Sequence, residues 1–571
     1  MMSPESQEKP VLIVGAGPTG LMLACELQRH GVACRVIDKA PVPGDKSRAL
    51  VLHARTLEIL ESMGIVERFI ERGCPAYGAS LYHQGERIVH LDMSELESPF
   101  PFSLMIPQTE TERLLTEHFV SKGGAIERGV ELTKFSQGKN GITVTVKNSK
   151  GKEDVIVAEW MIGADGSHST VRKVLELPFE GSAYEERFGL VDCLVSSDLP
   201  DDEISTFFHE DGAFVFFPLG NKRFRIVVNV PPSQVIGDAP SLADMQVFAD
   251  RRGPGNIKLH DPVWLAWFTI HQRSVSKYRV GRVFLAGDSA HIHSPIGGQG
   301  MNTGMQDAFN LAWKLALAIR GNGDDRLLDS YNEERHPVGQ ELLKGTDMAT
   351  SVATLKNPLA QQIRNHVMSF LSQQEVIQHR MRKVGSMLAV NYRNSSIVGE
   401  KRGLGEIQIK PSDDSEKPSI PGYFEFARGP LPGDRAPDAV MVDQDMNPIR
   451  IYEAMHGISH NLLLLDGKPT DAGYRKLEKI AWSIGEQFGG LVTCHLIVAS
   501  DKAPSLRFPG KVFLDPDLAV HQTYFADSEC LYLIRPDGYI GFRGQPAKLV
   551  PIEDYLSKIL KPAKVQTKQT Q

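Results

Sequence analysis

The sequence predicts a mixed α/β protein built around a parallel sheet, and three observations lead to this prediction. A glycine-rich turn follows the β-branched run of residues 11–14 and opens a helix. A second apolar run, residues 160–162, ends in glycine and an acid. A third, residues 282–286, leads into a long glycine loop and an amphipathic helix. Short apolar runs that alternate with helices in this way are typical of buried parallel strands.

Composition places the chain among globular proteins of two or three domains. It has 571 residues, of which 41% are hydrophobic and 23% charged. The net charge of −7 argues against nucleic acid or an anionic membrane as a partner. The polar first ten residues lack a signal-peptide core, and no apolar run is long enough to span a membrane. The six cysteines are scattered without a C-x-x-C pair, so we expect a cytoplasmic protein without a metal site.

The first glycine turn has the spacing G-x-G-x-x-G, with Gly15, Gly17 and Gly20 at its fixed positions. A second short strand then ends at Asp38. Such a turn lets the backbone approach a pyrophosphate, and the helix N-terminus holds the phosphates. The acid accepts hydrogen bonds from a ribose, which favours a dinucleotide with free ribose hydroxyls, such as FAD or NAD.

The longest glycine loop covers residues 287–304 and precedes a helix that starts near Asn302. Backbone N–H groups and the positive end of the helix dipole would therefore face an anion. Four glycines allow a large planar group to come close to the backbone. A surface loop capped by a helix is the alternative interpretation.

The remaining patterns divide the chain into domains. Short alternating strands separated by turn residues predict an antiparallel sheet over residues 78–102 and 183–271. A segment rich in Pro, Gly and charge, 401–430, is predicted to be a linker. A β-α-β pattern over 431–561 predicts a second α/β domain, followed by a polar tail, 562–571. Residues 1–77, 103–182 and 272–400 then form the dinucleotide-binding domain with its following helices.

Three motifs in this order resemble the single-component FAD-dependent aromatic hydroxylases, the para-hydroxybenzoate hydroxylase class. They are the turn at residues 15–20, the run Gly163-Ala164-Asp165-Gly166 that leads to Arg172, and the loop at 287–302. The resemblance covers about residues 10 to 390. The C-terminal domain is similar to the thioredoxin-like appendage of phenol, hydroxyphenylpropionate and polyketide hydroxylases and of rifampicin monooxygenase. Because it lacks C-x-x-C, we expect a packing or dimer role there.

The resemblance implies a Rossmann-like FAD-binding domain and a role for individual positions. Residues expected to hold FAD are Gly15, Gly17, Pro18, Thr19, Gly20, Asp38, Lys39, Arg48, Gln108, Val130, Asp165, Gly166, Asp288, Pro295, Gly298, Gly300, Met301 and Asn302. Of these, Arg48, Pro295 and Gly298 would also lie beside the reacting atoms. A helix N-terminus near Asn302 would stabilise the negative charge of reduced flavin by about 0.3–2 kcal/mol.

The resemblance also implies the reaction. NADH or NADPH reduces FAD by hydride transfer, and O2 then adds at flavin C4a to give a hydroperoxide. The hydroperoxide hydroxylates a small-molecule phenolic substrate, which can be polycyclic. Phe214 and Phe216 would roof the substrate chamber and exclude water. His53, Tyr82, His209 and His271 are candidate groups to activate the phenol, and each also fits a structural role.

One departure and two alternatives accompany this interpretation. Leu50 stands where phenol hydroxylase carries an acid, so that acid–base role is not transferred. A non-oxygenating flavin dehydrogenase of the same fold is one alternative. The other is a nucleotide-binding interaction protein that uses residues 430–571 as an adaptor. The protein is expected to be a monomer or a homodimer.

Overall fold

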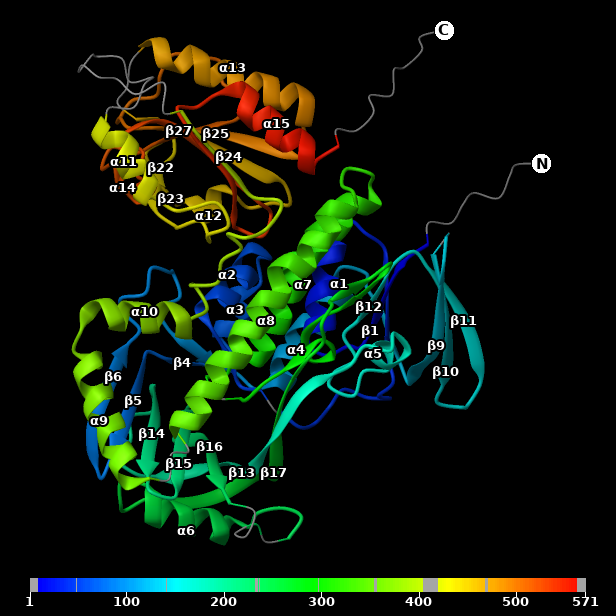
Figure 1. Cartoon of the computed structure of the whole chain (residues 1–571), viewed down its shortest axis with the longest axis vertical. Coiled ribbons are helices and arrows are strands. Elements are labelled where there is room, and N and C mark those ends of the chain that lie inside the picture. Colours follow the sequence, from blue (N-terminus) through cyan, green and yellow to red (C-terminus); the bar gives the residue numbers. More distant parts are fainter. Residues whose placement is uncertain are drawn as a thin grey trace. The chain divides into compact units, whose positions relative to one another are not determined.

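The computed structural model describes residues 9–47, 49–139, 141–231, 235, 237–295, 297–353, 357–403, 420–467 and 471–561 (Figure 1). The chain forms two compact units. The first comprises Met1–Phe309 and Arg335–Ala389, and the second Asn310–Glu334 and Val390–Gln571. Across the described ranges, no helix combines the length and the apolar character needed to cross a membrane.

A six-stranded sheet forms the centre of the first unit, in the order β18-β19-β12-β1-β2-β8. All neighbours in it run parallel except β18 and β19, which confirms the predicted parallel sheet. Its strands are β1 (Val11–Val14), β2 (Cys34–Asp38), β8 (Ile126–Arg128), β12 (Met161–Gly163), β18 (Arg279–Val280) and β19 (Val283–Leu285). The accompanying helices are α1 (Pro18–Arg29), α2 (Ala54–Ser62), α3 (Val66–Ile70), α4 (Gln108–Ser121) and α5 (Thr170–Val174).

Two small antiparallel sheets accompany it. One contains β9 (Val130–Gly138), β10 (Gly141–Asn148) and β11 (Glu153–Ala158). Strands β10 and β11 pair across the turn that contains Gly151, which confirms this predicted hairpin. The other sheet contains β3 (Val51–Leu52), β4 (Cys74–Ala76) and β7 (Ser103–Met105).

The predicted antiparallel sheet has eight strands, in the order β20-β17-β13-β16-β15-β14-β5-β6. Only β14 and β5 pair in parallel among its neighbours. The strands are β5 (Gly78–His83), β6 (Glu86–Asp92), β13 (Glu180–Ser196), β14 (Glu203–His209), β15 (Gly212–Pro218), β16 (Arg223–Val230), β17 (Lys258–Ser274) and β20 (His291–Ile292). Helix α6 (Leu242–Arg252) covers one face, where its Met245 and Ala249 join the core (Figure 1).

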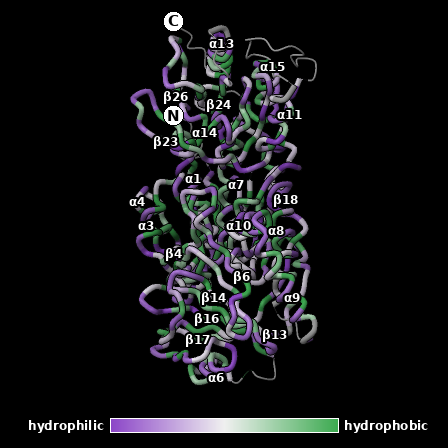
Figure 2. Tube along the Cα trace, turned by 90° about the vertical axis from the view of Figure 1, so that its left-hand side faces the viewer, coloured by the Kyte–Doolittle hydropathy of each residue, from purple (hydrophilic) through white to green (hydrophobic). Residues whose placement is uncertain are grey.

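Helices α7 (Gly300–Ile319) and α8 (Asp325–Ala353) each contribute to both units. The first unit takes residues 300–309 of α7 and 335–353 of α8, and is completed by α9 (Pro358–Ser372) and α10 (Glu375–Gly385). Figure 2 shows the trace coloured by hydropathy, with hydrophobic and hydrophilic stretches alternating along the chain.

The second unit is built on one mixed sheet in the order β21-β28-β27-β24-β25-β26-β22-β23. Its strands are β21 (Gly399–Arg402), β22 (Val440–Val442), β23 (Pro448–Arg450), β24 (His460–Gly467), β25 (Val492–Val498), β26 (Lys511–Leu514), β27 (Ser528–Ile534) and β28 (Ile540–Gln545). Its helices are α11 (Ile420–Arg428), α12 (Ile451–Ala454), α13 (Asp471–Phe488), α14 (Ala519–Thr523) and α15 (Leu549–Ile559). Strands β27 and β28 pair across the predicted turn at Asp537 and Gly538.

The division differs from the predicted boundaries. Trp313 and Leu317 of α7 and Leu327 of α8 pack in one core with strands and helices of the C-terminal sheet. The apolar stripe of a helix predicts that one face is buried but not in which core, so these segments were expected in the first domain. The predicted linker contains α11, whereas its residues 404–419, like the tail at 562–571, lie outside the described residues.

Candidate active site

The first glycine turn leaves an open helix N-terminus. Helix α1 starts at Pro18 after Gly17, and no side chain in the described part of the chain caps it, so its first N–H groups are available to an anion. A side chain at Gly15 would collide with Ala164, and one at Gly20 would collide with Gly15. A side chain at Gly17 would meet nothing within 4 Å. Two of the glycines therefore serve close packing, and the third borders open space.

Asp38 lies beside this turn at the end of β2. Its Oδ2 accepts a hydrogen bond from the N–H of Ala16 at 2.7 Å, and its Oδ1 accepts one from Ala40 at 2.7 Å. Arg128 Nη1 lies 3.7 Å from Oδ2. The half-buried Val130 begins β9 two residues further on, and Lys39 is exposed next to Asp38. The carboxylate is thus fixed over the glycine turn.

Two loops at the same edge of the sheet are joined by Arg172. Its guanidinium donates to the backbone oxygens of Ser167, at 2.7 Å, and Ser289, at 2.9 Å. Asp165 Oδ2 accepts from the N–H groups at the start of α5, while its buried Oδ1 has no hydrogen-bond partner among the residues that the structure describes. Gly166, at φ +78°, borders open space. Asp288 is exposed in the short helical turn Gly287–Ser289.

Asn302 organises the loop before α7. Its Oδ1 accepts from the N–H of His53 at 2.9 Å, and its Nδ2 donates to the oxygens of Val51, at 2.8 Å, and Gly298, at 2.9 Å. Gly298 adopts φ +65°, where a side chain would press on Val51 at 2.7 Å. Gly300 and Met301 are half-buried in the first turn of α7, and Pro295 is exposed.

His53 is a structural part of this loop. Its Nε2 lies 2.8 Å from the oxygen of Gly297 and its Nδ1 3.2 Å from Ser103 Oγ. Burial lowers the pKa of His53 to about 4, against the raising effect of the bond to Gly297. Both nitrogens are occupied, which favours the structural role over activation of a phenol.

Gln108 begins α4 and forms hydrogen bonds to both residues that flank Arg48. Its side-chain oxygen accepts from the N–H of Ala49 at 3.2 Å, and its own N–H donates to Ser47 Oγ at 2.8 Å. Its side-chain nitrogen donates to Glu112 at 2.8 Å. Arg48 itself, predicted as both a cofactor contact and a catalytic residue, lies outside the described residues.

The prediction for Phe214 and Phe216 is wrong. Both are fully buried, at 0% exposure, in the core beneath α6, and so line no open chamber. Tyr82 is half-buried and stacks on Phe207 at 4.7 Å at the edge of the same core, and its place near the substrate stays a prediction. His209 lies at the β14–β15 turn, where its Nδ1 accepts from the N–H of Asp211 at 3.2 Å.

Strand parity explains this error. Successive side chains of a strand point to opposite faces, so Phe217, not Phe216, lies on the face away from α6. The burial of β15 alternates accordingly, and Phe217 packs against a cluster that contains Val51, a neighbour of Gly298. Directly opposite Phe217 in the register stands Arg225, held by Asp192 through two bonds of 2.7 and 2.8 Å. The alternation rule could have found Phe217 once Phe214 was assigned to the core.

Comparison with known proteins places this geometry in a family. The family described as FAD binding domain matches residues 8–346. The chain is 33% identical over 551 residues to 6-methylpretetramide 4-monooxygenase from Streptomyces rimosus, covering 95% of this chain and 92% of that protein. It is 32% identical over 553 residues to pentachlorophenol 4-monooxygenase from Sphingobium chlorophenolicum, covering 94% of each. The solved OxyS anhydrotetracycline hydroxylase from Streptomyces rimosus is 29% identical, with a TM-score of 0.73 over 98% of this chain and 100% of that one.

The chain therefore belongs to the FAD-binding domain family. It is an enzyme, a flavin-dependent monooxygenase that uses FAD with NAD(P)H and O2. The expected resemblance to aromatic hydroxylases is confirmed. The alternatives of a non-oxygenating dehydrogenase and a non-catalytic adaptor find no support among these relatives.

The site fits FAD on its own geometry. A dinucleotide needs an uncapped helix N-terminus for its pyrophosphate, and α1 provides one. It also needs space beside the glycine turn, which exists over Gly17, and an acid anchored nearby, which is Asp38. The buried Oδ1 of Asp165 is a further acceptor, one that no residue in the described ranges bonds.

Proposed function

We propose that this monooxygenase hydroxylates a phenolic substrate of more than one ring. The observation that carries this proposal is the half-buried face of the eight-stranded sheet opposite α6, which includes Thr206, Val215, Phe217 and Val227 beside the ion pair of Arg225 with Asp192. From β14 to β13 this face crosses three strand spacings, or about 14 Å, which is the length of a fused-ring molecule rather than of a single phenol. Relatives named for tetracycline-type substrates support the same size class.

The cofactor is assigned to the loops that surround the first turn of α1. Gly15, Gly17, Pro18, Thr19 and Gly20 would carry the pyrophosphate, and Asp38 the ribose, with Lys39 and Val130 at its rim. Arg48 and Gln108 would meet the phosphates and the ribityl chain, and Asp165, Gly166 and Asp288 would complete that side. Pro295, Gly298, Gly300, Met301 and Asn302 would border the ring. The helix dipoles and anchored acceptors already described support these assignments.

Bound FAD supplies the redox chemistry with NAD(P)H and O2. The protein would position the reactants and exclude water from them. Half-buried apolar side chains such as Phe217 and Val215 would exclude water from the reacting ring. His53 would hold the loop at Gly297 through its neutral ring and would not take the phenol proton. The ionisation of the phenol would then depend on the substrate and on the dipoles around it.

The second unit is proposed to be a thioredoxin-like domain without redox function. Its support is the central strand order β28-β27-β24-β25, in which β24 and β25 are parallel and β27 and β28 form a hairpin. Helices α13 and α15 contribute to the core on one face. A cytoplasmic location and a monomeric or homodimeric state belong to the same proposal.

The test is a screen of NAD(P)H consumption by the yellow, FAD-loaded protein. Phenols of one to four rings are compared, and products are analysed by mass spectrometry for one added oxygen. Multi-ring phenols should stimulate consumption more than single-ring phenols and yield the oxygenated product. If only single-ring phenols are hydroxylated, the substrate class is wrong. If nothing is oxygenated, the proposal fails entirely.

A further inference from the structure

A buried carboxylate, Asp307, lies behind the loop Gly287–Ser289. It stands two turns into α7 and is 0% exposed. Its Oδ2 accepts from the N–H of Gly287 at 3.0 Å and from His291 Nε2 at 2.8 Å. Its Oδ1 accepts from Arg335 Nε at 2.7 Å, and Arg335 also donates to the oxygen of Thr303 at 3.1 Å. One carboxylate thus bonds the loop, its exit strand β20 and α8.

Two of the glycine motifs, the turn at residues 15–20 and the loop at 287–304, meet beside the residue that Asp307 holds. A side chain at Gly287 or at Gly304 would collide with the Thr19 hydroxyl in the first turn of α1. The Cα of Gly287 therefore lies between the first turns of α1 and α7. A shift of Gly287 would move Asp288 relative to both helix N-termini.

We propose that Asp307 is a positioning residue for FAD, which fixes the loop Gly287–Ser289 through the Gly287 N–H. The proposal rests on the proposed function, because it takes FAD to contact this loop. Asp307 itself would not touch the cofactor. Its effect would reach FAD through the backbone and through Asp288.

The carboxylate form is what the site requires. Burial alone would raise the pKa of Asp307, but Arg335 and His291 hold it below its usual range, so the group is ionised at neutral pH. Every polar atom that faces it is a donor: the Gly287 N–H, His291 Nε2 and Arg335 Nε. An asparagine would turn an NH2 group toward one of these donors and break that bond.

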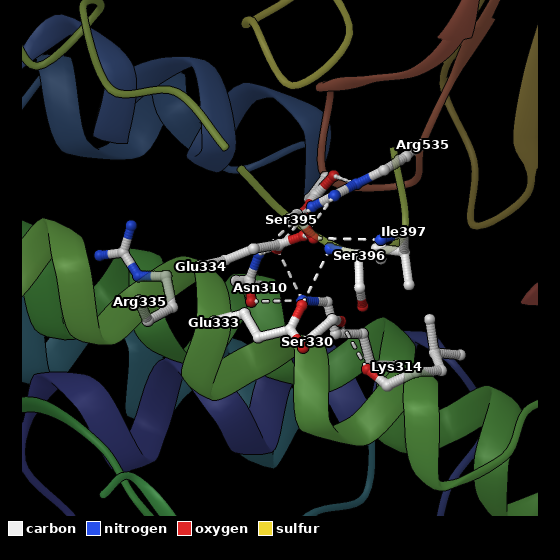
Figure 3. A network of polar contacts seen from close by, with 12 residues as sticks. Asn310, Lys314, Ser330, Glu333, Glu334, Arg335, Ser395, Ser396, Ile397 and Arg535 are labelled. Carbon is white, nitrogen blue, oxygen red and sulfur yellow. Dashed lines mark hydrogen bonds and ion pairs between the residues drawn. The ribbon is translucent and has the colours of Figure 1, made fainter. Parts of the chain in front are cut away.

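Glu334 offers a matched control. It is the residue before Arg335 on α8, is fully buried, and pairs with Lys314 Nζ at 2.7 Å and with Arg535 at 2.6 and 2.9 Å. It also accepts from Asn310 and Ser395, each at 2.7 Å (Figure 3). Figure 3 shows Arg335 directed away from this network. In the described part of the chain, none of these bonds reaches residues 287–291, so Glu334→Gln removes a comparable buried charge without touching the loop.

The experiment compares Asp307→Asn, Glu334→Gln and the wild-type protein as full chains. FAD dissociation constants come from flavin fluorescence, loop opening from hydrogen exchange of peptides that cover residues 283–295, and stability from thermal unfolding. We expect both variants to lose stability. Only Asp307→Asn should exchange faster in the loop and bind FAD roughly 10- to 100-fold more weakly, the range for one hydrogen bond to a charged group.

Equal FAD affinities in the two variants, or equal loop exchange, would overturn the proposal. A wild-type protein that binds no FAD would instead overturn the proposed function. Should Asp307→Asn not fold, His291→Leu and His291→Gln replace it. Glutamine keeps a donor near the Nε2 position and should bind FAD as the wild type does, whereas leucine should weaken binding. Equal affinities of these two variants would also count against Asp307.

Discussion

His53 Nε2 lies 2.8 Å from the backbone oxygen of Gly297, although 244 positions separate the two residues in the chain. The bond connects the end of β3 to the glycine loop before α7, and Asn302 bonds to the same two segments. Because burial lowers the pKa of His53 to about 4, the ring is neutral at physiological pH and donates through Nε2–H. The geometry of this loop therefore depends on a neutral imidazole.

Acid should destabilise the protein through His53. A histidine with a lowered folded pKa contributes stability above its unfolded pKa of about 6.5 and loses it as the pH falls toward 4. Between pH 7.5 and 5, His53→Gln should lose about 2 kcal/mol less stability than the wild type. Denaturant titrations at both pH values measure this. The exposed His379→Gln should behave as the wild type, and identical losses in all three proteins would contradict the prediction.

A rise in pH should destabilise the second unit through deprotonation of His521. Its ring lies between Asp515, at 2.7 Å, and Asp466, at 3.1 Å, and although burial opposes the charge, these carboxylates raise its pKa to about 8. The sign is opposite to that of His53: the stability is present below about pH 6.5 and lost as the pH rises through 8. Between pH 6 and 9.5 the loss should be about 2 kcal/mol and absent in His521→Gln. Thermal unfolding at these pH values is the measurement, with the exposed His456→Gln as control. A wild-type stability that does not fall in this window would refute the assignment.

Substitutions at Phe217 and Phe214 should distinguish an effect on substrate binding from an effect on stability. Phe217→Ala removes a half-buried ring from the proposed substrate face and should raise KM for a multi-ring phenol about tenfold, with FAD content unchanged. Phe214→Ala empties a site of 0% exposure and should cost about 3–5 kcal/mol of stability. Steady-state kinetics and thermal unfolding distinguish the two. A raised KM for Phe214→Ala with normal stability would reverse the assignment of faces.

Substitutions at Gly17 and Gly20 should likewise separate an effect on FAD binding from an effect on stability. Gly17→Ala places a methyl group where the protein leaves space, so the fold should lose no more than about 1 kcal/mol. FAD affinity should fall about tenfold or more, because the methyl group would enter the proposed pyrophosphate site. Gly20→Ala collides with Gly15 and should lower stability itself. The ratio of flavin to protein absorbance after gel filtration, with thermal unfolding, tests both. Full FAD content in Gly17→Ala would place the pyrophosphate elsewhere.

The sequence predicted the sheet and the three loops because glycines and acids at fixed spacing have few other uses. It did not assign Phe214 correctly, since a strand with aromatic residues at alternate positions does not indicate which face meets the cofactor domain. Nor did it distinguish Asp307 from an ordinary polar helix position, because its donors come from residues 287, 291 and 335. Residues 310–334 were placed in the wrong unit for a related reason. The apolar stripe of a helix does not indicate which core it packs against.

The pairing of Glu334 with Arg535 restricts how this chain can be recombined with its relatives. Arg535 also bonds Asp537, and Glu334 also bonds Lys314, so two buried negative charges and two buried positive charges balance as a set of four. A chimaera whose C-terminal segment keeps the aspartate but lacks the arginine would leave Glu334 and Asp537 with Lys314 as the one positive charge of the set, at a cost of about 3–5 kcal/mol. Gene fusions joined after residue 389 should therefore be least stable when the donor sequence carries only one member of the Arg535–Asp537 pair at this turn.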